Sequence, residues 1–347
     1  MRARRSPLSR TTESNSFPAR VRAATHAFPP ARSRRWDDPE RLQPVGRRPH
    51  RPKITAGSIH RMESESGVIL VVGGAGKTGR RIVWQLQMGD RPVRATSSRL
   101  GEARLDLADK RTWAPALSGV TSVYLMIPSS RMALASRKVV QEFSSQAAEA
   151  GVRRIVLLSG IGVGIADDSY PLKKAEDELR ASGVEWTILR PTWFSQNFSE
   201  SYWRTDVLQG SLCLPTGDGK VSFIDAEDIA EVAVAALTGD EHVGRIYELT
   251  GPRAISFAEA ADLISKATQR VVRHVDISAQ AYSERLAAQG IPPEVARMRT
   301  HLHVAIREGR DGSASLSHDV LRVLGRPPRS FEDYVTKAAL AGDWSCP

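Results

Sequence analysis

Cysteine is scarce in this sequence. Cys213 and Cys346 are the two cysteines among 347 residues, and they lie far apart along the chain. Two distant thiols provide neither a disulfide framework nor a cysteine cluster for a metal ion. We therefore expect a reducing, cytoplasmic setting.

Long apolar runs are missing too. The longest, Ile155 to Ala166, has about 12 residues and is interrupted by three glycines, whereas a membrane-spanning helix needs about 18 apolar residues. No apolar segment follows Arg4 and Arg5, as a secretory signal would require. We expect neither a membrane partner nor export.

Acidic residues are few at the start of the chain. Residues 1–65 contain 15 Arg and Lys against 6 acidic residues, whereas the remainder contains 34 basic and 33 acidic residues. This Arg-, Pro- and Ser-rich segment has no helical or strand period, which predicts a disordered extension. Three interpretations stay open: an upstream extension with true initiation at Met62, a solvated tail, or an arm for targeting or for an anionic polymer. We expect no nucleic-acid partner for the folded part, 66–345.

The rest of the chain alternates apolar runs with helical segments. The expected strands cover residues 68–72, 92–96, 120–127, 154–158, 185–189 and 245–250. Apolar runs separated by helices are typical of a parallel sheet covered on both faces. The fold class is therefore α/β, a Rossmann-type doubly wound sheet. We expect a small, mainly helical substrate-binding cap formed by about 192–216 and 252–345.

A glycine loop follows the first expected strand and opens a helix expected over residues 77–88. The loop consists of Gly73, Gly74, Ala75, Gly76, Lys77, Thr78 and Gly79. Glycines permit a tight turn and close backbone approach, and a helix N-terminus attracts a diphosphate. This context predicts a dinucleotide site. A nucleotide-hydrolysing P-loop is excluded, because its first glycine would fall at Val71.

The segment after the second expected strand bears on the choice of dinucleotide. It contains no carboxylate for the ribose 2′-hydroxyl of NAD, and Arg99, with Arg80 or Lys77, could bind the 2′-phosphate of NADP. NADP is favoured over NAD, and the alternative is that Arg99 is a solvated loop residue. Asp106 is expected either to meet the adenine or to cap a helix.

Other candidates come from the ends of later strands. Ile127 and Pro128 lie at the end of the strand expected over 120–127, near the expected nicotinamide position or in an ordinary loop. Trp193, Phe194 and Asn197 follow the strand expected over 185–189. All three could line a flat substrate pocket. The alternative for Trp193 and Phe194 is that they belong to the core between the sheet and the C-terminal cap.

Tyr170 and Lys174 have the spacing of residues that share a helix face. A nearby ammonium would lower the pKa of the phenol, so Tyr170 could donate a proton while Lys174 contacts the nicotinamide ribose. Ser159 would orient a substrate oxygen. Pro171 fits only the first turn of a helix, which instead makes Tyr170 a cap residue.

Two acidic residues and two histidines are expected to have no catalytic or metal-binding role. Asp225 and Asp228 precede an expected helix and fit an N-cap and a first-turn acid. His301 and His303 have no third ligand at convincing spacing, so no metal is expected.

From about Val68 to Trp344 the chain resembles the NmrA-like branch of the atypical short-chain dehydrogenases/reductases, including azoreductase and ergot-alkaloid-type dehydrogenase relatives. The matching segments are GGAGKTGRR, TWAPALSGVTSVYLMIP, GVRRIVLLSG, KAEDELRASGVEWTILRPTWFSQNF, DAEDIAEVAVAAL, GRIYELTGP and LGRPPRSFEDY. The resemblance implies an NAD(P)-binding Rossmann fold, and it makes Lys174 the retained active-site lysine.

The function expected from these patterns is NAD(P)H-dependent hydride transfer to a small conjugated acceptor such as a quinone, azo compound or imine, by a monomer or homodimer. The alternative is a regulatory protein of the NmrA type, which binds the dinucleotide without turning it over.

Overall fold

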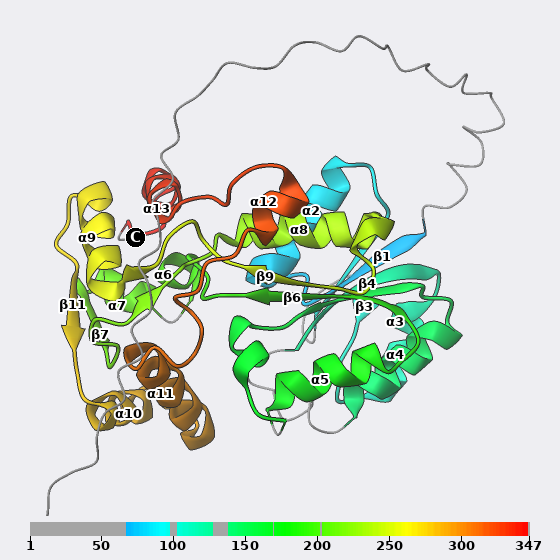
Figure 1. Cartoon of the computed structure of the whole chain (residues 1–347), viewed down its shortest axis with the longest axis horizontal. Coiled ribbons are helices and arrows are strands. Elements are labelled where there is room, and N and C mark those ends of the chain that lie inside the picture. Colours follow the sequence, from blue (N-terminus) through cyan, green and yellow to red (C-terminus); the bar gives the residue numbers. More distant parts are fainter. Residues whose placement is uncertain (1–66, 98–102, 128–137, 169, 202, 346–347) are drawn as a thin grey trace, which may run out of the picture. The chain divides into compact units, whose positions relative to one another are not determined.

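The computed structural model describes residues 67–97, 103–127, 138–168, 170–201 and 203–345 (Figure 1). The expectations for residues 1–65, Arg99 and Pro128 therefore lie outside the described residues. Within those ranges, no helix combines the length and the apolar character that crossing a bilayer requires.

Seven parallel strands form the central sheet, in the spatial order β3-β2-β1-β4-β5-β6-β9. Their bounds are β1 (Val68–Val72), β2 (Val93–Ser97), β3 (Ala103–Arg104), β4 (Val120–Met126), β5 (Arg154–Leu158), β6 (Glu185–Pro191) and β9 (Arg245–Leu249). The strand order reverses beside β1, and ligands of open α/β sheets bind at such a point. The predicted Rossmann-type fold is confirmed.

Helices cover both faces of this sheet (Figure 1). Because side chains alternate along a strand, Leu70 and Val72 of β1 pack into one core, and Ile69 and Val71 pack into another. The first core contains α3 (Trp113–Leu117), α4 (Val139–Glu149) and α5 (Pro171–Arg180). The second contains α2 (Lys77–Met88), α8 (Ala226–Thr238) and α12 (Asp319–Leu324).

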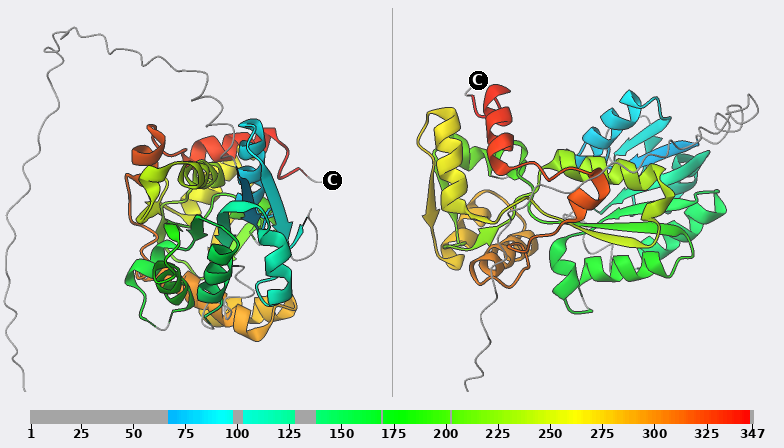
Figure 2. Two further views of the ribbon diagram at one scale, coloured as in Figure 1. Left: turned by 90° about the vertical axis from the view of Figure 1, so that its right-hand side faces the viewer. Right: turned by 45° about the horizontal axis from the view of Figure 1, so that its top comes forward.

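A mostly helical C-terminal region has its own core beyond the carboxyl ends of the strands (Figures 1 and 2). It is centred on the aromatic rings of Phe198, Trp203, Phe223, Phe257 and Phe331. Its helices are α6 (Asn197–Glu200), α7 (Arg204–Leu208), α9 (Phe257–Thr268), α10 (Ala279–Ala288), α11 (Pro293–Arg307) and α13 (Phe331–Leu340).

The structure differs from several of the expected element bounds. β2 is shifted by one residue from the expected range 92–96, and β4 and β9 each end one residue earlier than expected. β6 runs through Pro191, so Arg190 and Pro191 belong to the strand instead of following it. The C-terminal region also contains short strands that the sequence patterns did not indicate. They pair β7 (Ser211–Leu214) with β11 (Arg273–Asp276) and β8 (Lys220–Val221) with β10 (Ile255–Ser256). Strands of two to four residues are too short for a period of two to be recognised.

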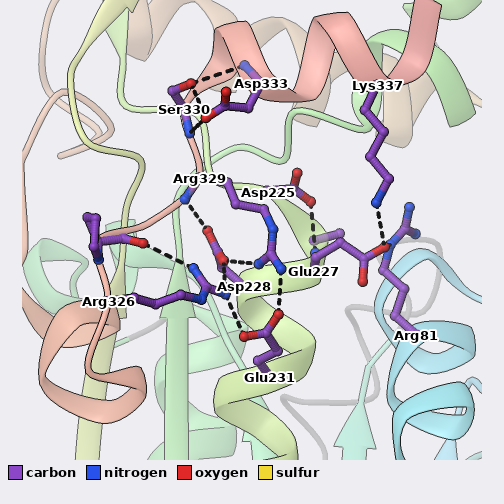
Figure 3. A network of polar contacts seen from close by, with 12 residues as sticks. Arg81, Asp225, Glu227, Asp228, Glu231, Arg326, Arg329, Ser330, Asp333 and Lys337 are labelled. Atoms are coloured by element: carbon purple, nitrogen blue, oxygen red, sulfur yellow. Dashed lines mark hydrogen bonds and ion pairs between the residues drawn. The ribbon is translucent and has the colours of Figure 1, made fainter. Parts of the chain in front are cut away.

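The N-terminus of α8 is the junction between the sheet and the segment that leads to α13 (Figure 3). Asp225 caps α8 by accepting from the Glu227 amide at 2.8 Å, and Asp228 lies in the first turn, so both predicted roles are confirmed. The wholly buried Asp228 forms ion pairs with Arg326, at 2.7 Å, and with Arg329. This carboxylate therefore anchors the chain between α12 and α13.

We predict that Asp228→Asn lowers the free energy of unfolding by about 3 kcal/mol, because two arginines lose a buried carboxylate. Glu231 contacts the same two arginines but is partly exposed, so Glu231→Gln should cost less than about 1 kcal/mol. Guanidinium chloride denaturation of both variants measures the difference. Equal losses would show that Asp228 is not the anchor.

Candidate functional site

The turn after β1 needs glycine for two reasons. Gly73 has a φ of +79°, a conformation that residues with a Cβ rarely adopt. A Cβ on Gly79 would lie 2.1 Å from the Gly73 carbonyl oxygen, and one on Gly74 would lie 2.8 Å from the Ala95 Cβ. The amides of Gly73 and Gly74 both donate to the Thr96 carbonyl, at 3.0 and 2.8 Å. The turn is thereby held against β2.

The N-terminus of α2 fits a dinucleotide diphosphate. Gly76 is the N-cap residue of this end, which no side chain among the described residues caps, and the first turn contains no acidic residue. The amides and the positive end of the helix dipole therefore suit an anion. The Thr78 side chain points elsewhere: it is buried, and its Oγ1 lies 2.8 Å from the Tyr124 hydroxyl. The diphosphate would therefore be held mainly by hydrogen bonds from backbone amides of this loop, with few contacts from side chains.

Lys77 reaches from this loop to the C-terminal region. Its Nζ donates to Asn197 Oδ1 at 3.0 Å, although the two residues are 120 positions apart. Burial lowers the pKa of the Lys77 ammonium, and the nearby Arg80 and Arg81 act in the same direction, while the Glu200 carboxylate opposes them. The expected cofactor loop and the expected substrate residue Asn197 are thus in direct contact.

A cleft of about 470 Å³ lies where the loop, the strand ends and α11 meet. Its lining brings together five of the predicted site residues outside the glycine loop, namely Ser159, Tyr170, Trp193, Phe194 and Asn197. The lining residues are Lys77, Ser159, Gly160, Ile161, Gly162, Val163, Tyr170, Pro191, Thr192, Trp193, Phe194, Asn197, Ser201, Arg299, Leu302 and Asp311. Ser159 follows β5, and Pro191 ends β6, so the cleft opens at the carboxyl edge of the sheet, where Rossmann ligands bind.

Tyr170 and Lys174 do not form the expected face-sharing pair. Helix α5 begins at Pro171, and Tyr170 is its N-cap residue with extended backbone, so the i, i+4 rule for helical side chains does not apply. Tyr170 lines the cleft, whereas the half-buried Lys174 is not among the described lining residues. Burial raises the pKa of the Tyr170 phenol, opposite to the lowering expected from a nearby ammonium.

Ser159 belongs to a buried ionic network that sequence reasoning missed. Its Oγ donates to Glu176 Oε1 at 2.5 Å, and Glu176 also binds Arg190 through both carboxylate oxygens, at 3.0 and 2.5 Å. Because the hydroxyl hydrogen is committed to Glu176, Ser159 can accept a hydrogen bond from a ligand in the cleft but cannot donate one. The residue that could have indicated this network in the sequence is Glu176, which lies two positions after Lys174, the lysine that the family resemblance singled out.

Trp193 and Phe194 line the cleft and also pack against the cores, so the core alternative is confirmed and the substrate role stays a prediction. The Trp193 ring stacks on Trp203, with centroids 5.4 Å apart and planes at 23°, and lies 5.3 Å from the His303 ring. Phe194 forms a parallel bridge with Ile224 and packs against the core of the sheet. The cleft wall is therefore backed by fixed aromatic packing.

The remaining candidates occupy less distinctive positions. Asp106 lies two residues beyond β3, and its Oδ1 accepts from the Ala108 amide at 2.9 Å, so it caps a turn. Ile127 is buried directly after β4. His303 is wholly buried, whereas His301 is exposed. No group of three or more His, Cys, Asp or Glu within the described ranges could hold a metal ion.

Comparisons with known proteins agree with this geometry. The model of a family described as NAD(P)H-binding matches residues 73–240. The NAD(P)H azoreductase of Xenophilus azovorans is 34% identical over 290 residues, covering 79% of this chain and 99% of that protein. Festuclavine synthase I of Penicillium roqueforti is 30% identical over 283 residues, covering 77% and 96%.

The solved structure of Citrobacter sp. triphenylmethane reductase complexed with NADP(H) has a TM-score of 0.66 and 20% identity, covering 78% of this chain and 99% of that one. At this identity the likeness concerns the fold alone. Together, the findings define an NAD(P)-dependent oxidoreductase. The chain belongs to the NmrA-like family of atypical short-chain dehydrogenases/reductases, which confirms the resemblance.

We predict that Gly79→Ala weakens NADPH binding at least tenfold, because the added Cβ would collide with the Gly73 carbonyl and displace the loop. Gly89 at the other end of α2 has a φ of −93°, and a Cβ there would lie 3.5 Å from the Gln85 carbonyl oxygen, in ordinary contact. Gly89→Ala is therefore the matched control. Isothermal titration should show normal affinity for Gly89→Ala, and normal affinity for Gly79→Ala would contradict the placement of the diphosphate.

The buried His303 should make stability depend on pH. Burial lowers the pKa of His303 to about 4, so between pH 6.5 and 4 the unfolded chain takes up a proton that the folded chain refuses. Stability is therefore lost as the pH falls, by about 3 kcal/mol at 1.36 kcal/mol per pKa unit. The gap, the unfolding free energy of wild type minus that of His303→Phe, should therefore fall by that amount from pH 7 to pH 4.

Denaturant titrations at several pH values measure this gap. His301→Phe provides the control on the same helix, because an exposed imidazole is hydrated in both states and its substitution should give a constant gap. A constant gap for His303→Phe as well would show that the folded protein accommodates the charged ring.

Proposed function

We propose that this chain reduces a small conjugated acceptor, such as a quinone, azo compound or imine, with NADPH as the donor. The observation that carries the proposal is the position of Lys77. It belongs to the first turn of the dinucleotide helix, and it lines the same cleft as Trp193 and Phe194. A dinucleotide on the loop and a flat acceptor against these rings would therefore share one cavity.

The dinucleotide would be held by the backbone of Gly73 to Gly79, and it supplies the hydride when bound. The preference for NADPH is supported by β2, which ends without a carboxylate at Thr96 and Ser97. In the sequence Arg99 follows, and we propose that it binds the 2′-phosphate.

The chain's own groups would orient the acceptor and supply a proton. Trp193 offers a flat ring that Trp203 holds in place by stacking, and flat conjugated molecules favour such a surface. Burial raises the pKa of Tyr170, so its phenol is protonated near neutral pH and is the proposed proton donor to the acceptor. An azo compound or imine gains the hydride and the proton across one double bond, a quinone ends with one hydrogen on each of its two oxygens, and solvent reprotonates Tyr170.

Lys174 is proposed to bind the nicotinamide ribose, as the family resemblance implies, and Ser159 to accept a hydrogen bond in the cleft. The azoreductase and festuclavine synthase names of two relatives support an unsaturated nitrogen or carbon acceptor. The proposed setting is the cytoplasm, where Cys213 remains a free thiol.

The test is NADPH oxidation, followed at 340 nm, with a panel of quinones, azo dyes and cyclic imines. We expect turnover with at least one class and a smaller dissociation constant for NADPH than for NADH. Lys174→Ala should lower kcat at least tenfold, and Tyr170→Phe should lower kcat with little change in KM. Lys173→Ala is the control, because Lys173 contacts Asp168 and the Ala166 carbonyl instead.

Tight dinucleotide binding without turnover on any acceptor would overturn the enzymatic proposal. It would favour the alternative of a dinucleotide-binding regulatory protein. Equal dissociation constants for NADPH and NADH would remove Arg99 from the site.

A further inference from the structure

One face of α11 contributes to the cleft from the C-terminal region. Arg299 and Leu302 both line it, and residues three apart lie on the same side of a helix. The next turn of α11 is fixed in the core, because the buried His303 donates from Nδ1 to the Arg299 carbonyl at 2.7 Å. The His303 ring also contacts Trp193. Arg299 is therefore carried on a rigid turn that packs against the flat wall of the cleft.

The charged side chains that line the cleft differ in their contacts and in their position relative to the dinucleotide loop. The charged residues in the described lining are Lys77, Arg299 and Asp311. The Asp311 Oδ1 is engaged in its own turn, where it accepts from the Ser313 amide at 3.1 Å and from its hydroxyl at 2.8 Å. Lys77 belongs to the dinucleotide helix and contacts Asn197. Among the described lining residues, Arg299 is thus the cation that lies away from the dinucleotide loop.

We propose that Arg299 selects acceptors whose conjugated system carries an acidic substituent, a carboxylate or a sulfonate. A guanidinium offers planar, paired N–H donors that match the two oxygens of such a group. With the ring of the acceptor against Trp193, its acidic group would meet Arg299. This inference rests on the proposed function, because it names the substrate class of the same cleft.

The test compares two acceptors that differ in charge but hardly in shape: 4-phenylazobenzoate and its neutral carboxamide. Wild type should favour the carboxylate in kcat/KM, mainly through KM. Arg299→Leu should reduce the carboxylate-to-carboxamide ratio by about 10- to 100-fold, the range expected for a hydrogen bond to a charged group. Arg299→Lys should restore part of the ratio, which a merely structural role would not predict.

Arg297→Leu is the matched control, because Arg297 lies on the same helix but is exposed and is not among the described lining residues. It should leave the ratio unchanged. A ratio near one in wild type, or one that survives Arg299→Leu, overturns the proposal.

A second measurement separates this inference from the proposed reaction. Isothermal titration of both azo compounds into the protein saturated with NADP⁺ reports binding without turnover. Tighter carboxylate binding that is lost in Arg299→Leu supports the role of Arg299, even if neither compound is reduced and the proposed function fails. Equal binding of the two compounds, or no binding of either to wild type, overturns it.

Discussion

The contact between the first turn of α2 and the turn before it leaves no space for a side-chain carbon. The Gly73 carbonyl lies where a Cβ on Gly79 would be, and the Gly73 and Gly74 amides are held by Thr96 of the neighbouring strand. This close approach directs the start of α2 toward the carboxyl edge of the sheet. Lys77 then lies where it can reach Asn197, and both residues line the cleft.

The features that the sequence predicted well are those determined by neighbours along the chain. The helix expected over 77–88 and the strand expected over 68–72 have those bounds in the structure, because apolar period and glycine position are local signals. The Asp225 cap was predictable for the same reason: a cap needs only the residue and the helix that follows it. Pro171 likewise indicated that Tyr170 would precede its helix.

The features that escaped prediction depend on contacts between distant segments. Lys77 and Asn197 are 120 residues apart, and Ser159 binds Glu176, which in turn binds Arg190 on another element. No pattern within one segment encodes these partners, because the packing of the whole sheet decides which side chains meet. The pKa of Tyr170 was misjudged for the same reason: burial, which the sequence does not display, dominates over a charge nearby in the chain.

The hydrogen bond from Lys77 to Asn197 also limits which chimeric proteins can be built from this chain and its relatives. Lys77 of α2, the helix proposed to bind the dinucleotide, donates to an amide oxygen from α6, and Arg81 of the same helix forms an ion pair with Glu200 at the end of α6. The two regions are thus not interchangeable modules. A chimera that joined the N-terminal half of this chain to a relative's C-terminal half would have to preserve both partners, or the Lys77 ammonium would lose the Asn197 oxygen and Arg81 would lose Glu200.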